Sequence, residues 1–170
     1  GQLMILSETQ SDDGLVEGYY GGTDIWLFKT DSLGNFIWGE VYGGIGIENT
    51  YDLIAYTDNQ YIIASVVNFV NGDIEFTHGD NDFWILGVDS LGEILWQKSI
   101  GGSLIDLPNS IKKINDNEII ITGYSNSIDF DVTPTYGSLN AWTVKLGFCT
   151  NRYYADSDGD GFGYIGSDTI

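Results

Sequence analysis

The sequence predicts an all-β fold, a partial β-propeller of about two and a half four-stranded antiparallel blades, and three observations lead to it. Trp26, Trp84 and Trp142 are spaced 58 residues apart, which indicates tandem repeats. The 23 glycines, 2 prolines and 14% aromatic residues are typical of short strands joined by tight turns. No stretch of the chain shows the periodicity of an amphipathic helix.

The repeat has three copies, at about residues 1–58, 59–116 and 117–147, and it runs without insertion or deletion. The same interval relates two copies of a tight turn and two glycine pairs, which are Asp31–Gly34 and Asp89–Gly92, and Gly43-Gly44 and Gly101-Gly102. Four strands per unit, at a period above about 40 residues, are typical of a propeller blade. A β-solenoid is the alternative, but solenoid coils are shorter and lack repeated tight hairpins.

The second copy shows the four expected strands in order. Residues 61–67 and 82–88 are apolar on both faces, so we expect them in the inner part of a blade. Residues 89–93 form a tight turn into the third run, residues 94–100. The fourth run, residues 110–114, carries lysines and is therefore expected to form the outer edge of the same blade.

The third copy ends after its second run, so the chain holds about ten strands. Propellers typically need about 4–8 blades to close. We therefore expect further blades of the same protein upstream, with closure using strands from its N-terminal region. The first residues carry no signal-peptide features, which agrees with an internal segment of a longer protein.

The formal net charge of −19 excludes some classes of partner. Such a field repels nucleic-acid phosphates and anionic membrane surfaces, whereas divalent cations are its natural counter-charge. No segment reaches the ~20 apolar residues of a membrane span. Cys149 is the single cysteine, so it has no partner within the chain and its pairing stays open.

Residues 148–170 leave the repeat and contain aspartates at alternate positions followed by Gly161, as at the start of a calcium loop. The expected Ca²⁺ ligands are Asp156, Asp158, Asp160, the carbonyl oxygen of Phe162, and Asp168. Ser167 stands where an EF-hand needs Glu, and no flanking helices are evident, so the segment is not an EF-hand. The alternative is a flexible acidic linker.

Other residues that can carry chemistry are interpreted as structural. The turn Asp31–Trp38 resembles the tryptophan-docking turn of quinoprotein propellers, but it recurs in the second copy, whereas a quinone cofactor needs only one site. Its Asp and Gly are therefore expected to hold the turn, and its Trp is expected to pack between blades. His78, the only histidine, corresponds to Tyr20 and is expected to be an aromatic packing position. The Asp-rich loops, such as Asn71–Asp73, are expected to be solvated turns; rim sites for cations or glycans are the alternative. Nothing singles out a carboxylate pair for glycoside hydrolysis.

The repeat resembles a β-propeller family of large secreted bacterial proteins, often exported by the type IX system. The resemblance covers residues 1–147 and rests on the glycine pairs, the strands that begin Asp24-Ile25-Trp26 and Asp82-Phe83-Trp84, and the Asp-Ser-x-Gly-x-x-x-Trp turns. The tail, residues 154–163, is similar to the Asp-rich calcium repeats of thrombospondin type 3. The resemblance implies secretion or surface display, with sorting signals beyond this chain, and no defined enzymatic activity.

These observations favour a non-catalytic extracellular scaffold or adhesion module, located outside the cell or on its surface, with a calcium-stabilised C-terminal segment. Its expected partner is an extracellular protein or glycan. The alternative is a fragment of a propeller enzyme acting on polysaccharide, with catalytic residues outside this chain. A quinoprotein dehydrogenase is a third and more distant reading.

Overall fold

The computed structural model describes residues 1–133 and 139–148, which form ten β-strands and no helix. The first sheet has the order β1-β2-β3, formed by Gln2–Thr9, Asp24–Asp31 and Phe36–Tyr42. The second has the order β4-β5-β6-β7, formed by Thr50–Thr57, Gln60–Val67, Asp82–Asp89 and Ile94–Ile100. The third has the order β10-β9-β8, formed by Asn140–Gly147, Glu118–Ser125 and Asp106–Asn115.

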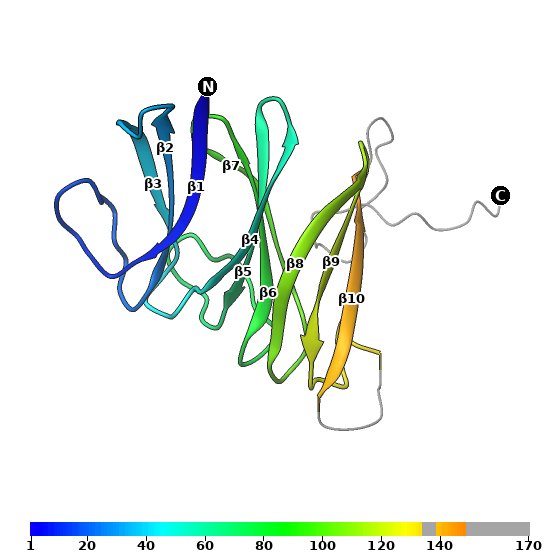
Figure 1. Ribbon diagram of the computed structural model, residues 1–170. Coiled ribbons are helices and arrows are strands. Elements are labelled where there is room, and N and C mark those ends of the chain that lie inside the picture. Colours follow the sequence, from blue (N-terminus) through cyan, green and yellow to red (C-terminus); the bar gives the residue numbers. More distant parts are fainter. Residues whose placement is uncertain (134–138, 149–170) are drawn as a thin grey trace.

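All strand pairs are antiparallel, and the three sheets stand side by side in chain order (Figure 1). The all-β class expected from the sequence is therefore confirmed. Within the ranges that the structure describes, no helix is long and apolar enough to cross a bilayer.

The 58-residue interval of the sequence reappears in the geometry of the backbone. The bounds of β1, β5 and β9 differ by this interval, and so do those of β2, β6 and β10. A bulge between Lys29 and Thr30 recurs between Gly87 and Val88. The isolated parallel bridges Thr23↔Ile47 and Asn81↔Ile105 also correspond. The second repeat therefore reproduces the irregularities of the first as well as its strands.

The fourth run of the first and of the second copy does not belong to the sheet of its own copy, so the expectation of an outer edge to that blade was wrong. β4 pairs with β5 and β8 pairs with β9, which makes each the first strand of the following sheet. The reason is the short loop between the two strands. Only Asp58 and Asn59 separate β4 from β5, and strands joined by a two-residue loop pair with each other as a hairpin. β4 and β8 are nevertheless edge strands, and they contact each other.

Two hydrophobic cores lie between the sheets, and the alternation of side chains along each strand builds both. On β6, Trp84 and Leu86 face the first sheet, whereas Phe83 and Ile85 face the third. The second sheet is therefore buried on both faces, which explains why β6 is apolar between its two terminal aspartates. Phe83 lies with its ring centroid 4.9 Å from that of Trp142 on β10, which ties the second sheet to the third.

Candidate functional site

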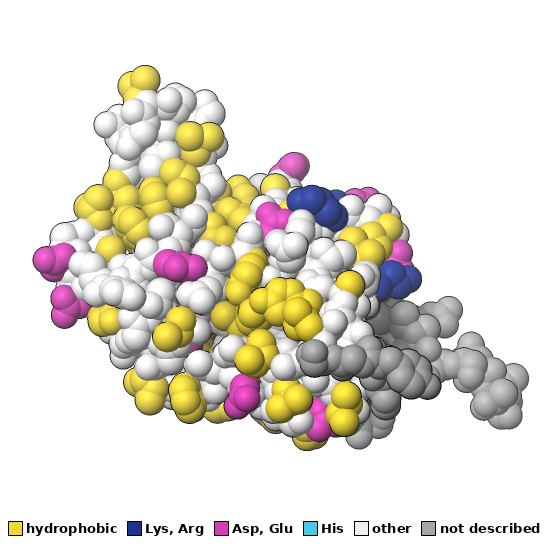
Figure 2. All heavy atoms as spheres, turned by 60° about the horizontal axis from the view of Figure 1, so that its bottom comes forward, with side chains coloured by type: hydrophobic (Ala, Val, Ile, Leu, Met, Phe, Trp, Pro, Cys, Tyr) yellow, Lys and Arg dark blue, Asp and Glu magenta, His cyan; other side chains and the backbone are white. Residues whose placement is uncertain are grey.

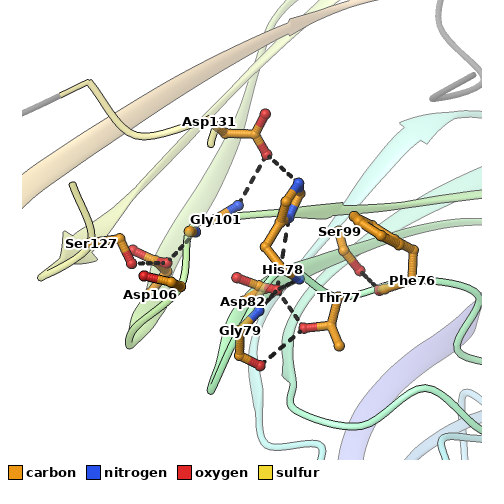
Figure 3. Close-up of polar contacts among 12 residues, drawn as sticks. Phe76, Thr77, His78, Gly79, Asp82, Ser99, Gly101, Asp106, Ser127 and Asp131 are labelled. Carbon is orange, nitrogen blue, oxygen red and sulfur yellow. Dashed lines mark hydrogen bonds and ion pairs between the residues drawn. The ribbon is translucent and has the colours of Figure 1, made fainter. Parts of the chain in front are cut away.

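A cluster of polar side chains lies where the loops between the sheets meet, at the glycine pair Gly101-Gly102 after β7 (Figure 3). Asp82 opens β6, Asp106 opens β8, and Asp131 lies in the loop after β9. We call this cluster the second junction. Its residues come from the second and third sheets, so it joins two successive repeats.

Two carboxylates of the third sheet bind the backbone N–H groups of the glycine pair, which follows the last strand of the second sheet. Gly101 N donates to Asp131 Oδ2 at 3.2 Å, and Gly102 N donates to Asp106 Oδ2 at 2.7 Å. Asp131 N in turn donates to Gly101 O at 3.1 Å. Ser127 Oγ also donates to Asp106 Oδ2, at 2.8 Å. A Cβ atom at Gly101 would collide with Asp82 Oδ1, so the close approach of backbone and carboxylate requires glycine.

Asp82 is fully buried and organises the loop that leads into β6. Its Oδ2 atom accepts hydrogen bonds from Thr77 Oγ1 and from the backbone N–H groups of His78 and Gly79. Burial raises the pKa of Asp82 above its ordinary value, and these donors act in the opposite direction. The side chain therefore caps the loop from within the protein.

The His78 ring packs between two aromatic rings at the edge of the second junction. Its centroid lies 4.7 Å from that of Phe76 and 5.0 Å from that of Phe130. Nε2 is 3.7 Å from Asp131 Oδ2, and Nδ1 is 3.9 Å from Asp82 Oδ2. The packing agrees with the aromatic position expected from the sequence. The two carboxylates beside the ring were not expected.

The first junction repeats this arrangement one copy upstream. Tyr20 N donates to Asp24 Oδ2 at 2.8 Å, as His78 N donates to Asp82. The glycine pair is bound in the same way: Gly43 N donates to Asp73 Oδ2 at 3.1 Å, and Gly44 N donates to Glu48 Oε2 at 3.0 Å. Tyr20 takes the place of His78, and its hydroxyl donates to Asp73 Oδ1 at 3.0 Å.

Asp24 and Glu48 form a buried carboxyl pair in the first junction, and both side chains have an exposed fraction of 0%. Burial raises the pKa of Glu48 to about 7, with the nearby Asp24 carboxylate adding to the rise. Burial also raises the pKa of Asp24. Two apposed buried carboxyl groups hold one proton between them, because ionising both in a low-dielectric site is costly. The raised pKa of Glu48 therefore favours its protonated form beside Asp24.

Four of the junction carboxyl groups are fully buried and cannot reach a substrate, whereas Asp131, with a side chain 40% exposed, lies at the surface. Asp24, Glu48, Asp82 and Asp106 all have exposed fractions of 0%. In the described part of the chain, no donor reaches Asp82 Oδ1 or Asp106 Oδ1. The junctions therefore act as joints between repeats.

The turns at Asp31 and Asp89 have the structural role expected from the sequence. Asp89 Oδ1 accepts from Leu91 N at 2.8 Å and from Glu93 N at 3.0 Å, and Asp31 binds the equivalent pair of N–H groups. Gly92 has a φ of +93°, a conformation that favours glycine. Trp38 packs against the core between the first and second sheets, and Trp96 against the core between the second and third.

The predicted calcium ligands lie outside the described residues, as does Cys149. They are Asp156, Asp158, Asp160, Phe162 and Asp168. Within residues 1–133 and 139–148, no group of three or more His, Cys, Asp or Glu side chains is placed to hold a metal ion. The calcium site therefore stays a prediction.

Sequence reasoning missed the junction acids, although a signal was present. Asp24 and Asp82 precede the repeated Trp by two positions, and Glu48 and Asp106 are acidic at the same 58-residue interval. The Asp-rich loops also do more than form solvated turns, because Asp73 and Asp131 bind the glycine pairs.

Comparison with known proteins adds no guide to the junctions. No family model matches the chain, and no curated protein matches it. The function is therefore inferred from the sheets, the junctions and the surface.

Proposed function

We propose that the chain is a non-catalytic extracellular scaffold or adhesion module, built as a run of propeller-type blades. The observation that carries this proposal is the repetition of the junctions. The first and second junctions bind their glycine pairs with equivalent carboxylates at a 58-residue interval, Asp73 with Glu48 and Asp131 with Asp106. A catalytic centre is needed once, whereas a joint between repeats is needed at every repeat.

The arrangement of the sheets supports the propeller-type reading. Three antiparallel sheets follow one another side by side, each packing an apolar face on the next (Figure 1). The second sheet has four strands in the chain order β4-β5-β6-β7. This is the connectivity of a blade, and we propose that further blades of the same protein extend the run upstream.

The enzyme alternative gains no support from the junction carboxyl groups. A glycosidase needs two carboxyl groups on either side of a bound sugar. Asp24, Glu48, Asp82 and Asp106 have no exposed surface, so no sugar contacts them. Catalysis by the whole protein would require residues beyond this chain.

The binding surface that we propose lies on the junction side of the sheets. Figure 2 looks onto this side, where hydrophobic side chains gather in patches. Phe69, Phe76 and Phe130 belong to its loops, with exposed fractions of 57%, 54% and 68%. Exposed aromatic rings stack on the apolar faces of sugars or fill pockets of a protein partner, and the net charge of −19 favours neutral or cationic partners.

Binding to insoluble xylan, cellulose and gelatin tests this function in a sedimentation assay. We expect the chain to sediment with at least one of these materials, and Phe76→Ala or Phe130→Ala to weaken its retention at least about tenfold. Leu91→Ala is the matched control, because Leu91 is also exposed but lies on the opposite, turn side. A steady release of reducing sugar ends that scales with chain concentration would contradict the non-catalytic role.

We further propose that Ca²⁺ orders the C-terminal segment through Asp156, Asp158 and Asp160. The net charge of −19 and the alternate carboxylates support this. Calorimetric titration with calcium chloride should show saturable heat with a dissociation constant of roughly 10⁻⁴–10⁻³ M, as for extracellular calcium modules. The triple change of these residues to Asn should abolish the heat, whereas Asp58→Asn in the β4–β5 turn should not. Absence of heat from the unaltered chain would refute the calcium site.

A further inference from the structure

The two outward faces of the three-sheet array differ in chemistry. Met4, Leu6, Ile25 and Leu27 of the first sheet point into the core with the second sheet. The alternate residues therefore point to the open side, which we call the proximal face. It comprises Leu3, Ile5, Trp26 and Phe28, with Phe36 beside them. Trp26 and Phe28 stack at a centroid distance of 4.2 Å, so the proximal face carries a continuous apolar surface.

The repeat shows what covers a face of this kind. Trp84, the equivalent of Trp26, is buried against the first sheet, with an exposed fraction of 0%. Trp142, the next equivalent, packs against the second sheet, with Phe83 4.9 Å away. Both internal interfaces thus place an aromatic or aliphatic residue of one sheet against the Trp of the next. Of these three equivalent residues, only Trp26 lacks such a cover within the described chain.

The opposite end of the array, which we call the distal face, is more polar than the proximal face. Ala141, Thr143 and Lys145 of β10 are exposed there, where the second sheet carries Phe83, Ile85 and Gly87. Lys145 Nζ lies 2.6 Å from Glu118 Oε1, a surface ion pair. Thr122 on β9 is also exposed, at the position where the second sheet has the buried Ala64. At the positions of Phe83, Ile85 and Ala64, this end therefore carries a small or polar residue, while Ile120 keeps the apolar position of Ile62.

We infer that the array grows in one direction: a further sheet of the same repeat docks on the proximal face, and the distal face is its end. This inference rests on the proposed function as a run of blades. Repeat arrays need a terminal unit with a polar outer face to stay soluble, and the distal face meets that need. In the further sheet, the strand equivalent to β4 would directly precede β1 in the chain. It would pair with the open edge of β1, as β4 pairs with β5.

Two extended chains test the direction. In the proximal extension, a second copy of residues 1–58 is placed before Gly1; in the distal extension, a second copy of residues 90–147 is placed after Gly147. Both keep the 58-residue phase. Each chain carries one introduced cysteine in a Cys149→Ser background, either Leu3→Cys on the proximal face or Thr143→Cys on the distal face. The rate at which this cysteine reacts with a thiol reagent reports its burial. Circular dichroism checks that each added copy forms strands.

The proximal extension should slow labelling of Leu3→Cys roughly tenfold or more, because the added sheet covers it. The distal extension should leave labelling of Thr143→Cys unchanged. Comparable protection at both ends would overturn the direction and leave the run of blades intact. Folded extensions that protect neither cysteine would overturn both the direction and the run of blades.

A repaired distal face provides the matched control. Thr143→Ile and Lys145→Gly copy residues of the second sheet, Ile85 and Gly87, onto the third. Thr122→Cys is the probe in this experiment. The distal extension should slow the labelling of this cysteine in the repaired chain, and it should leave the labelling unchanged in the chain that keeps Thr143 and Lys145. Lack of protection in the repaired chain would show that polarity is not what ends the array, and would overturn the inference.

Discussion

At the junctions, single residues are determined by how closely backbone and carboxylate approach. Gly101 lies against Asp82 and Gly43 against Asp24, with no room for a Cβ atom at either glycine. The left-handed conformation at Gly72, with a φ of +60°, recurs at Phe130, whose φ is +51°. Phe130 accepts this unfavourable conformation at the position that sets its ring against His78.

Gly72→Ala tests the tightness of the first junction. The new Cβ would meet Gly43 O and also require a left-handed conformation, so we expect a loss of about 2–3 kcal/mol in the free energy of unfolding. Gly14→Ala is the matched control: its φ is +71°, but nothing lies within 4 Å, so the loss should be about 1 kcal/mol. Urea unfolding measures both, and equal losses would contradict the close contact.

The Asp24–Glu48 pair predicts a dependence of stability on pH. Because the pKa of Glu48 is raised to about 7 from an ordinary value of 4.5, the folded protein keeps its proton at pH values where the unfolded chain loses it. The contribution of Glu48 to the free energy of unfolding is therefore fully present below about pH 4.5. It falls by on the order of 2 kcal/mol as the pH rises towards 7. Carboxylates with a lowered pKa, such as Asp31 beside Asn35, affect stability at lower pH.

Urea unfolding between pH 5 and 8 measures this fall. Glu48→Gln should flatten the dependence, because the amide is neutral at every pH and no longer titrates. A variant with the same slope as the unaltered chain would show that the proton resides elsewhere.

At the scale of elements, the strands could be predicted from the sequence far better than their partners. The runs expected at residues 82–88 and 94–100 match β6 and β7 within one residue. The fourth run was identified as a strand but assigned to the wrong sheet, because apolar and polar patterns mark a strand and do not state which neighbour it pairs with. The link of Asp58 and Asn59 decides the pairing.

The candidate site was less accessible to sequence reasoning. Asp and Glu are ordinary turn residues, and their burial at the junctions follows from contacts between loops that lie far apart in the chain. Asp82 and Asp131 are 49 positions apart, yet both border the same glycine pair.

The turn between β6 and β7 depends on one carboxylate. Asp89→Ala removes the acceptor for two backbone N–H groups, so we expect a loss of about 1 kcal/mol in the free energy of unfolding. Leu91→Ala is the control within the same turn, because Leu91 is 68% exposed and contributes its backbone N–H to the turn. Thermal unfolding compares the two variants, and an unaffected Asp89→Ala would show that Gly92 alone holds the turn.

The contact between the second and third sheets depends on Phe83. Its side chain is 0% exposed, so Phe83→Ala should cost about 3–5 kcal/mol and release the third sheet first. Phe69→Ala, at 57% exposed, removes the same atoms from the surface and should cost less than about 1 kcal/mol. Amide exchange shows which sheet opens: uniform loosening of all three sheets would contradict the separate core at this interface.

At the scale of the whole molecule, one rule generates the array: each 58-residue step places a Trp-bearing face against the preceding sheet and closes a polar junction below it. The rule accounts for the second sheet, which is covered on both sides, and for the unlike ends of the array. The cores and four junction acids are buried inside the array, while the loop aromatics on which the proposed binding depends face solvent.

The central claim is that successive repeats stack equivalent strands face to face, and a nuclear Overhauser measurement tests it most directly. Trp142 is the β10 equivalent of Trp84, and its ring centroid lies 4.9 Å from that of Phe83. Cross-peaks between the Phe83 ring protons and the Trp142 indole protons are therefore expected in the folded chain. Assigned resonances of both rings without such cross-peaks, in a chain that shows intact β6–β7 pairing, would contradict the stacking of the repeats.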